Sequence, residues 1–168
     1  MEGMDRRDYV AEKFGGMDRA RAIHSSLAQA GAEEGIEFNF NSIERTPNTV
    51  HSHRLVRHAA EHGLQTPLIS AIFDAYFLEG KDIGEPEILA DIAEIVGLNR
   101  DRTIRFLESD IDTETILAED ELARRLGVNG VPCFIMNRKY AVSGAQSPEV
   151  LVQVFDLANQ DATPALSE

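Results

Sequence analysis

The 168-residue sequence has no tryptophan and a single cysteine, Cys133. One cysteine excludes an internal disulfide, a CxxC dithiol and a multi-cysteine zinc site within these residues. Basic residues are scarce, because 16 Lys and Arg stand against 29 Asp and Glu, for a formal net charge of −13. This charge disfavours nucleic acid and anionic membranes as partners, since their phosphate groups attract the opposite sign.

Long hydrophobic runs are also missing. No apolar run approaches the roughly 18 residues of a membrane span. The first ten residues, MEGMDRRDYV, lack the apolar segment of a signal peptide, so we expect a cytoplasmic protein. Apolar residues make up 43% and charged residues 27% of the chain, which is typical of a globular protein with one real core.

Apolar periodicity and capping signals predict a helical chain up to residue 127. Helices are expected over 5–14, 17–34, 46–62, 85–96 and 113–126, with two more that begin near Thr66 and Asn99. Pro47 is expected at the first position of the third helix, because proline lacks the N–H that this position does not use. Residues 36–41 alternate apolar and polar side chains, which fits a half-buried strand or an extended loop.

The pattern changes at residue 128. Residues 131–136 and 140–142 predict a β-hairpin, and Ser147-Pro148 predicts the start of a last helix with Val150, Leu151, Val154, Phe155 and Ala158 on its inner face. Pro132 opens the first strand, although a proline cannot donate to a sheet ladder. Gly130-Val131-Pro132 alone fits either a plain edge-strand proline or the cis proline that opens the third strand of a thioredoxin fold.

Other chemical motifs are weak. His58 and His62 are four residues apart on one predicted helix, which is a metal-ligand spacing, but polar surface histidines account for them better. The carboxylates show no spacing that singles out an acid/base pair. A Gly-rich phosphate loop and a G-x-S-x-G nucleophile motif are both missing from these residues.

Longer motifs carry a resemblance over most of the chain. G-V-x-G-V-P-x-F-I-x-x-x-x-Y-x-V-S-G-A-Q-x-P-E-V-L, which starts at Gly127, R-T-P-N-T-x-x-x-H-R-L at 45–55 and F-x-A-Y-F-x-E-G-x-D-I-G at 73–84 resemble the DsbA-like thiol–disulfide oxidoreductases of the FrnE type. Their relatives are the 2-hydroxychromene-2-carboxylate isomerases and kappa-class glutathione transferases. The resemblance implies an α/β thioredoxin-like fold with a large all-helical insertion, here mostly helical with a C-terminal ββα. We expect the insertion at 1–127, the ββα part at 128–160 and a tail at 161–168.

One departure from the family is large. Members begin with a strand, a C-P-W-C-type motif, a helix and a second strand, and only then reach a segment like Glu2–Arg6. That leading unit is not part of this sequence, so the catalytic residues of the family cannot be carried over. Cys133 follows the proline and does not match the catalytic pair, although it stays a possible thiol.

Substrate-facing residues can be carried over from the resemblance. Val131, just before Pro132, matches the position whose backbone meets an extended peptide or glutathione. Gly144, Ala145 and Gln146 match the segment that meets the γ-glutamyl end of glutathione in the transferases, and a helix N-terminus favours a carboxylate. Asn48 and His51 open the insertion helix that overhangs the active site in the family. Capping and surface polarity are the alternative roles of these two residues.

Three functions follow as hypotheses. The chain is a thiol–disulfide oxidoreductase relative without its CxxC unit, a glutathione-dependent isomerase of the hydroxychromene-carboxylate type, or a non-catalytic helical module for binding or dimerisation. We expect no bound cofactor and no metal, with glutathione as a candidate co-substrate. The expected partners are an extended peptide or a glutathione-like small thiol and a second copy of the chain, because an isolated hairpin has an unpaired edge and is marginally stable.

We predict that the 168-residue chain alone has no dithiol turnover. One thiol forms a mixed disulfide but has no second thiol in the chain to resolve it. An insulin-reduction assay with the purified chain checks this prediction. Catalytic reduction that disappears in Cys133→Ser would contradict it.

Overall fold

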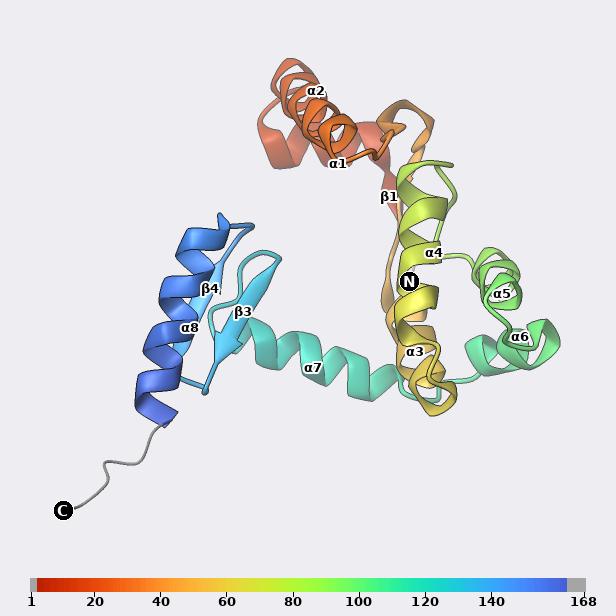
Figure 1. Cartoon of the computed structure of the whole chain (residues 1–168). Helices are drawn as coiled ribbons and strands as arrows, with labels where there is room; N and C mark the ends of the chain where they lie inside the picture. The colour runs from red at the N-terminus through yellow and green to blue at the C-terminus, as the bar shows by residue number, and fades with distance from the viewer. Residues whose placement is uncertain (1–2, 163–168) are drawn as a thin grey trace. The chain divides into compact units, whose positions relative to one another are not determined.

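The computed structural model of the chain describes residues 3–162. The chain divides into two compact units, Met1–Leu117 and Ala118–Glu168, and the division falls inside one helix, α7 (Thr113–Arg125). The first unit is helical, and the second contains a hairpin and a long helix (Figure 1). The predicted boundary at residue 127 is a different kind of boundary, because it separates an insertion from its parent domain. A division into compact units does not test it, so it stays a prediction.

The first unit contains two very short paired strands and a series of helices. Its elements are β1 (Met4–Asp5), α1 (Arg6–Phe14), α2 (Met17–Glu33), the 3-10 helix η1 (Phe40–Ser42), β2 (Arg45–Thr46), α3 (Val50–Ala59), the 3-10 helix η2 (Ala60–His62), α4 (Gln65–Phe77), α5 (Pro86–Ile95), α6 (Arg100–Glu108) and the start of α7.

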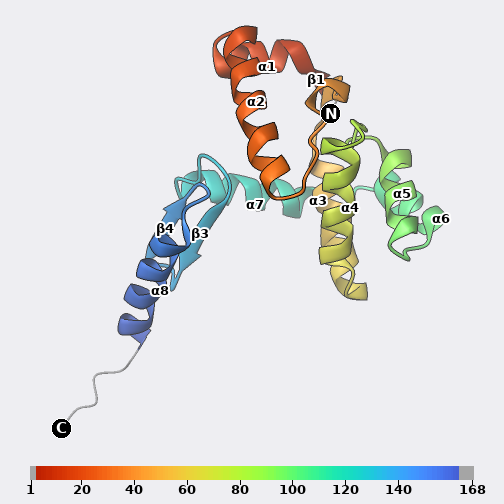
Figure 2. The same ribbon diagram turned by 45° about the horizontal axis from the view of Figure 1, so that its top comes forward.

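Helices α1 and α2 form a helical hairpin (Figure 2). The carboxylate of Asp5 accepts the backbone N–H groups of Arg7 and Asp8, which satisfies two of the donors that a helix start leaves free. Gly15 has a φ of 74° and ends α1 in the left-handed region, where glycine carries no steric cost. The predicted break at Gly15-Gly16 is therefore correct.

The starts of two elements differ from the sequence-based expectation. Helix α3 begins at Val50 with Thr49 as its N-cap, so the prediction that Pro47 takes its first position is wrong. The physical reason is that Arg45 and Thr46 pair with β1 and hold the preceding chain extended. Residues 36–39 have no regular structure and lead into η1, so the loop alternative for 36–41 is correct and the strand alternative is wrong.

The core of this unit lies among α3, α4, α5 and α6. Leu55, Leu68, Leu89 and Leu107 are the largest apolar side chains that are almost completely buried there. The apolar stripe predicted for α4 is only partly inside, because Phe73 is 55% exposed. Burial on this scale is the main stabilising contribution in a helical unit.

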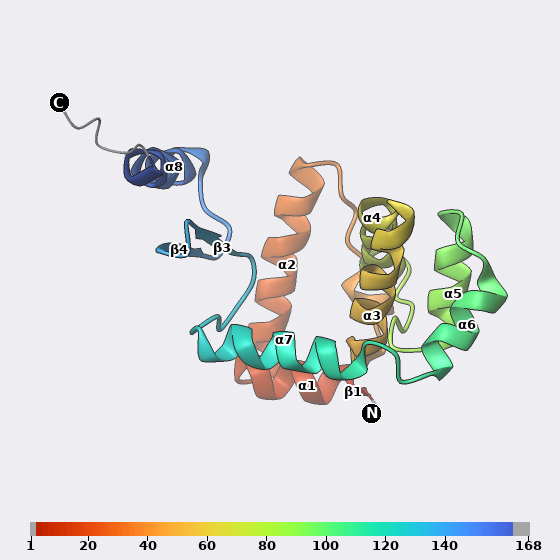
Figure 3. The ribbon, with the colours of Figure 1, turned by 90° about the horizontal axis from the view of Figure 1, so that it is seen from below.

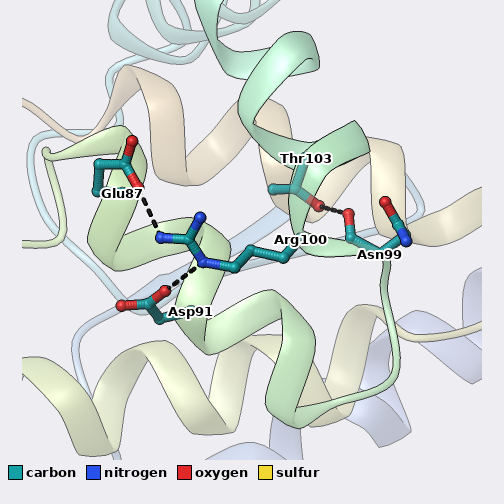
Figure 4. Close-up of polar contacts among 5 residues, drawn as sticks. All are labelled: Glu87, Asp91, Asn99, Arg100 and Thr103. Carbon is teal, nitrogen blue, oxygen red and sulfur yellow. Dashed lines mark hydrogen bonds and ion pairs between the residues drawn. The ribbon is translucent and has the colours of Figure 1, made fainter.

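Helices α5 and α6 are joined by polar contacts around Arg100, shown in Figure 4. Its guanidinium lies 2.7 Å from Asp91 Oδ1 and 2.6 Å from Glu87 Oε2, two carboxylates one turn apart on α5. Asn99 caps α6 as predicted, with its side chain accepting the N–H of Arg102 at 3.0 Å. The Thr103 hydroxyl donates to the Asn99 carbonyl at 3.0 Å, which fixes the first turn of α6.

A buried arginine ties α3 to the chain that follows α6. Arg54 is 1% exposed, and each of its five N–H groups has an acceptor. Four of these acceptors are backbone carbonyls, at Phe106, Leu107, Ser109 and Ile111. The last carbonyls of a helix have no intrahelical partner, so Arg54 satisfies the end of α6.

The second unit contains the rest of α7, β3 (Cys133–Met136), β4 (Tyr140–Ser143) and α8 (Pro148–Ala162). The strands pair antiparallel, with Cys133 opposite Ser143 and Met136 opposite Tyr140, as the predicted hairpin requires. Helix α8 lies over this hairpin (Figure 3). At the turn, Asn137 and Arg138 both have positive φ and the Lys139 N–H donates to the Met136 carbonyl at 3.0 Å, as in type I′ hairpin turns.

Three side chains of this turn are tied to α8. Asn137 donates to the Ala158 carbonyl at 2.7 Å, the Tyr140 hydroxyl donates to Asp161 at 2.7 Å, and Lys139 also pairs with Asp161. The hydrogen bonds from Lys139 and then Tyr140 hold the pKa of the Asp161 carboxyl below its ordinary value. Residues 161 and 162 of the predicted tail belong to α8, and 163–168 lie outside the described residues.

The predicted inner face of α8 is wider than the observed one. Ala158 is buried and Leu151 and Val154 are half-buried, but Val150 is 37% and Phe155 47% exposed. A hairpin of two four-residue strands is too narrow to cover all five positions.

We predict that Arg54→Met lowers the stability of the first unit by about 3 kcal/mol, because it leaves four backbone carbonyls without their buried donor. Amide hydrogen exchange of α3 and α6 in the full chain measures this change. Arg57→Met, a half-exposed arginine on the same helix that pairs with Asp112 at 3.4 Å, is the matched control and should cost at most about 1 kcal/mol. Equal losses in the two variants would contradict the role given to Arg54.

Candidate functional site

The candidate site in the second unit is the segment that leads into β3. The Val131–Pro132 peptide bond is cis, so that prediction is confirmed. The Val131 side chain is 88% exposed. On the β4 side, the Gly144 N–H donates to the Pro132 carbonyl at 2.8 Å, which extends the ladder by one bond beyond Cys133 and Ser143. The opposite edge of β3 has no strand partner among residues 3–162.

The turn from β4 into α8 brings together the three residues of the predicted γ-glutamyl site. Gly144 has a φ of 82°, a left-handed conformation that favours glycine. The Gln146 side chain folds back and donates to the Ser143 carbonyl at 2.9 Å, and Ala145 between them is exposed. Val131, Pro132, Gly144, Ala145 and Gln146 therefore lie at one end of the hairpin.

The start of α8 already holds a carboxylate. Glu149 stands in the first turn, where the Ser147 hydroxyl and then its own backbone N–H lower the pKa of its carboxyl by hydrogen bonding. Helix N-termini favour negative charge, and Glu149 supplies it from within the chain. A carboxylate arriving from a ligand would therefore meet a like charge here.

Cys133 is the first residue of β3 and is half-buried. Its backbone faces Ser143 across the hairpin. A lone thiol in this position can form a mixed disulfide with another molecule but cannot complete a dithiol exchange.

The other predicted site residues, Asn48 and His51, belong to the first unit and form a separate group there. The Asn48 side chain accepts the Val50 N–H at 3.0 Å and so helps to start α3. His51 Nδ1 lies 2.9 Å from a guanidinium nitrogen of Arg54. Because a guanidinium only donates, Nδ1 accepts and the proton of the neutral ring is on Nε2.

Arg54 is the residue of this group that the sequence did not single out. Burial lowers the pKa of its guanidinium, and the charges of Asp110 and Asp112 oppose the shift. Helical periodicity assigns an arginine to the solvent side, so no sequence pattern marked it as the support of His51.

The histidine pair is divided between two elements, with His58 at the end of α3 and His62 in η2. Their rings meet edge to face with centroids 5.5 Å apart, and His58 stacks on Phe106 at 4.5 Å. The described residues contain no group of three metal-ligating side chains. The expectation of surface histidines is correct for His62, whereas His58 is half-buried by its ring contact. Within residues 3–162, no helix has the length and apolar character needed to cross a membrane.

Comparison with known proteins places this geometry in a family. The family described as "DSBA-like thioredoxin domain" matches residues 2–156. The chain belongs to this family. Its fold is a DsbA-like thioredoxin fold, as the resemblance implied, and the family is one of thiol–disulfide oxidoreductases.

Individual relatives agree with this assignment. The chain is 31% identical over 96 residues to the thiol:disulfide interchange protein DsbA of Pseudomonas syringae pv. tomato and 29% identical over 96 residues to that of Azotobacter vinelandii. Each alignment covers 56% of this chain and 45% of the relative, so the chain matches less than half the length of these proteins. The crystal structure of a probable DsbA oxidoreductase from Streptomyces coelicolor superposes with a TM-score of 0.85 at 26% identity, covering 99% of this chain and 72% of that one.

We predict that His51 makes the first unit less stable in mild acid. Burial and the nearby charge of Arg54 lower the pKa of His51, with Glu85 opposing them. The unfolded chain therefore binds a proton first as the pH falls below about 6.5, and the stability that comes from the neutral ring is lost there and retained above it.

Unfolding midpoints between about pH 7.5 and pH 5 measure this dependence. His51→Gln should flatten it, and His62→Gln, at the exposed histidine, serves as the control. A pH dependence that is the same in the wild type and His51→Gln would contradict the prediction.

Proposed function

We propose that this chain carries the substrate-binding strand of a FrnE-type thiol–disulfide oxidoreductase and pairs it with an extended peptide. The observation that carries the proposal is the open edge of β3 next to Val131. Because Gly144 already occupies the β4 side of Pro132, an incoming peptide has the opposite edge of β3 available for backbone hydrogen bonds. The exposed Val131 side chain adds an apolar contact at the start of that edge.

The start of α8 favours a peptide over glutathione as the partner. In the isomerase-type alternative, the segment at Gly144–Gln146 would meet a γ-glutamyl carboxylate. Glu149 places its own ionised carboxyl at this helix start, and the side-chain amide of Gln146 already donates an N–H to the Ser143 carbonyl. The uncharged backbone of a bound peptide is not repelled by Glu149 and does not need the amide of Gln146.

In this function the chain binds the substrate and does not itself carry out dithiol exchange. The 168 residues contain one cysteine, so they contribute the binding step and no dithiol pair. We keep the cytoplasm as the proposed compartment, since a single free thiol suits a reducing environment.

We predict that a short acetylated and amidated peptide rich in valine and threonine, with serine in place of cysteine, binds at this edge. NMR titration of the full chain should show saturable amide shifts confined to residues 131–135 and 143–146. Val131→Asp should weaken binding by about fivefold or more, because it sets a charge against an apolar contact. Val152→Asp, at a 53% exposed valine of α8, is the matched control. Equal weakening by both variants would refute the assignment of the edge.

Reduced glutathione in the same titration separates the isomerase-type alternative. Saturable shifts centred on 144–149, strengthened by Glu149→Gln, would favour that alternative over peptide binding. Under our proposal glutathione causes no saturable shift there.

A second proposal is that the same edge pairs with another copy of the chain. Phe134 is 39% and Ile135 50% exposed on β3, which is more apolar surface than a stable isolated hairpin presents. A two-fold antiparallel pairing of two β3 strands would close the edge and place side chains of the second copy beside Phe134 and Ile135. Self-association and peptide binding then compete for one set of backbone groups.

We predict a homodimer in light scattering at moderate salt, with a mass about twice 18.6 kDa. The peptide described above should shift the mass towards the monomer, because it occupies the pairing edge. A single species near 18.6 kDa across micromolar concentrations would exclude the dimer while leaving peptide binding open to its own titration.

A further inference from the structure

A cavity lies in the first unit, between α1, α2 and the segment that begins with η1. It has a volume of about 240 Å³. Because liquid water takes about 30 Å³ per molecule, this volume suits a small organic molecule rather than a single ion. Its lining includes Arg6, Arg7, Arg21 and His24, together with the apolar Val10 and Phe40.

The charge of this lining is opposite to that of the chain. Three arginines and a histidine line the cavity and no acidic residue does, although the chain carries 29 acidic residues against 16 basic ones. Two nearby carboxylates, Asp5 and Asp18, are already engaged. Asp5 accepts backbone N–H groups at the start of α1, and Asp18 pairs with Arg21 at 2.9 Å on the exposed side of α2.

Arg21 has an ion pair with Asp18, but the other two arginines of the lining have none within residues 3–162. Arg6 makes only long contacts, at 3.4 Å to the Thr46 hydroxyl and 3.5 Å to the Tyr76 hydroxyl, and its buried Nε has no partner among the described residues. The guanidinium of Arg7 has no ion pair within residues 3–162. An anionic ligand would supply the counter-charge that Arg6 and Arg7 lack among the described residues.

The floor of the cavity is apolar and rigid. Val10 and Ala20 are almost fully buried, and the His24 ring stacks on Phe40 with centroids 4.7 Å apart. Burial and the charge of Arg6 lower the pKa of His24, so the ring is neutral and adds a hydrogen-bonding group without adding charge. An apolar floor with cations at the rim suits a molecule with a short carbon body and an oxyanion group.

We propose that this cavity, defined by Arg6, Arg7, Arg21 and His24, binds a small organic oxyanion, either a carboxylate or a phosphate or sulfate ester. Guanidinium groups hold such oxyanions by paired N–H donors. The site is formed entirely within α1, α2 and residues 40–43, so it is independent of the peptide binding proposed for the hairpin.

The test is an NMR titration of the full 168-residue chain with sulfate and with succinate, at ionic strength held constant with sodium chloride. Both probes keep their charge near neutral pH, so changes in the His24 ring signals report occupancy of the cavity. We expect saturable shifts with dissociation constants below about 10 mM, which is ordinary for a two- or three-contact anion site. Tighter binding of succinate points to the carboxylate form of the ligand, and tighter binding of sulfate to the ester form.

Two double variants separate a built site from general attraction of anions. Arg7→Gln with Arg21→Gln changes two exposed arginines of the lining and should weaken binding by about tenfold or more. Arg19→Gln with Arg102→Gln removes the same charge from exposed positions outside the cavity and should change binding less than about twofold. Non-saturable shifts in the wild type, or equal weakening in the two double variants, would overturn the proposal.

A failure here is distinct from a failure of the proposed function. The peptide titration reads residues 131–135 and 143–146, whereas the anion titration reads His24 and its neighbours. Each result therefore stands without the other.

Discussion

The guanidinium of Arg54 is surrounded by acceptors that lie more than fifty residues further along the chain, from Phe106 to Ile111. Burying a cation costs several kcal/mol unless its donors are all used, and here all five are. The arrangement fixes where α6 ends, since the freed carbonyls of its last turn point at one side chain of α3. It also sets the ring orientation of His51, because Nδ1 of this histidine receives the remaining N–H.

The sequence predicts local features of this fold well and long-range ones poorly. Asn99, Gly15 and the apolar run from residue 131 act on their immediate neighbours, so capping, helix ends and the hairpin could be placed from the sequence alone. The site at Val131 and Gly144 followed from a long motif shared with a family, not from periodicity. The motif at 45–55 contains Arg54 but assigns it no role, because the role of a buried arginine depends on acceptors that only the folded chain brings to it.

The errors in the predictions also arise from contacts that form only in the folded chain. Pro47 carries a strong local signal for a helix start, but pairing of the two preceding residues with β1 delays α3 until Val50. On α8, the spacing of Val150 and Phe155 fits an inner face, but whether a face is covered depends on the width of its partner. Tertiary contacts decide both cases, and no local pattern contains them.

The hairpin of the second unit is held at one end. Asn137, Lys139 and Tyr140 join its turn to the last turns of α8 by polar contacts, and at the Val131 end the chain passes into α8 through residues 144–147. Because these polar contacts hold the strands at the turn, thermal motion of the strands should grow from the turn towards Val131. A partner strand at that free end would damp this motion, and part of its binding energy would be offset by the lost entropy of the strand it meets.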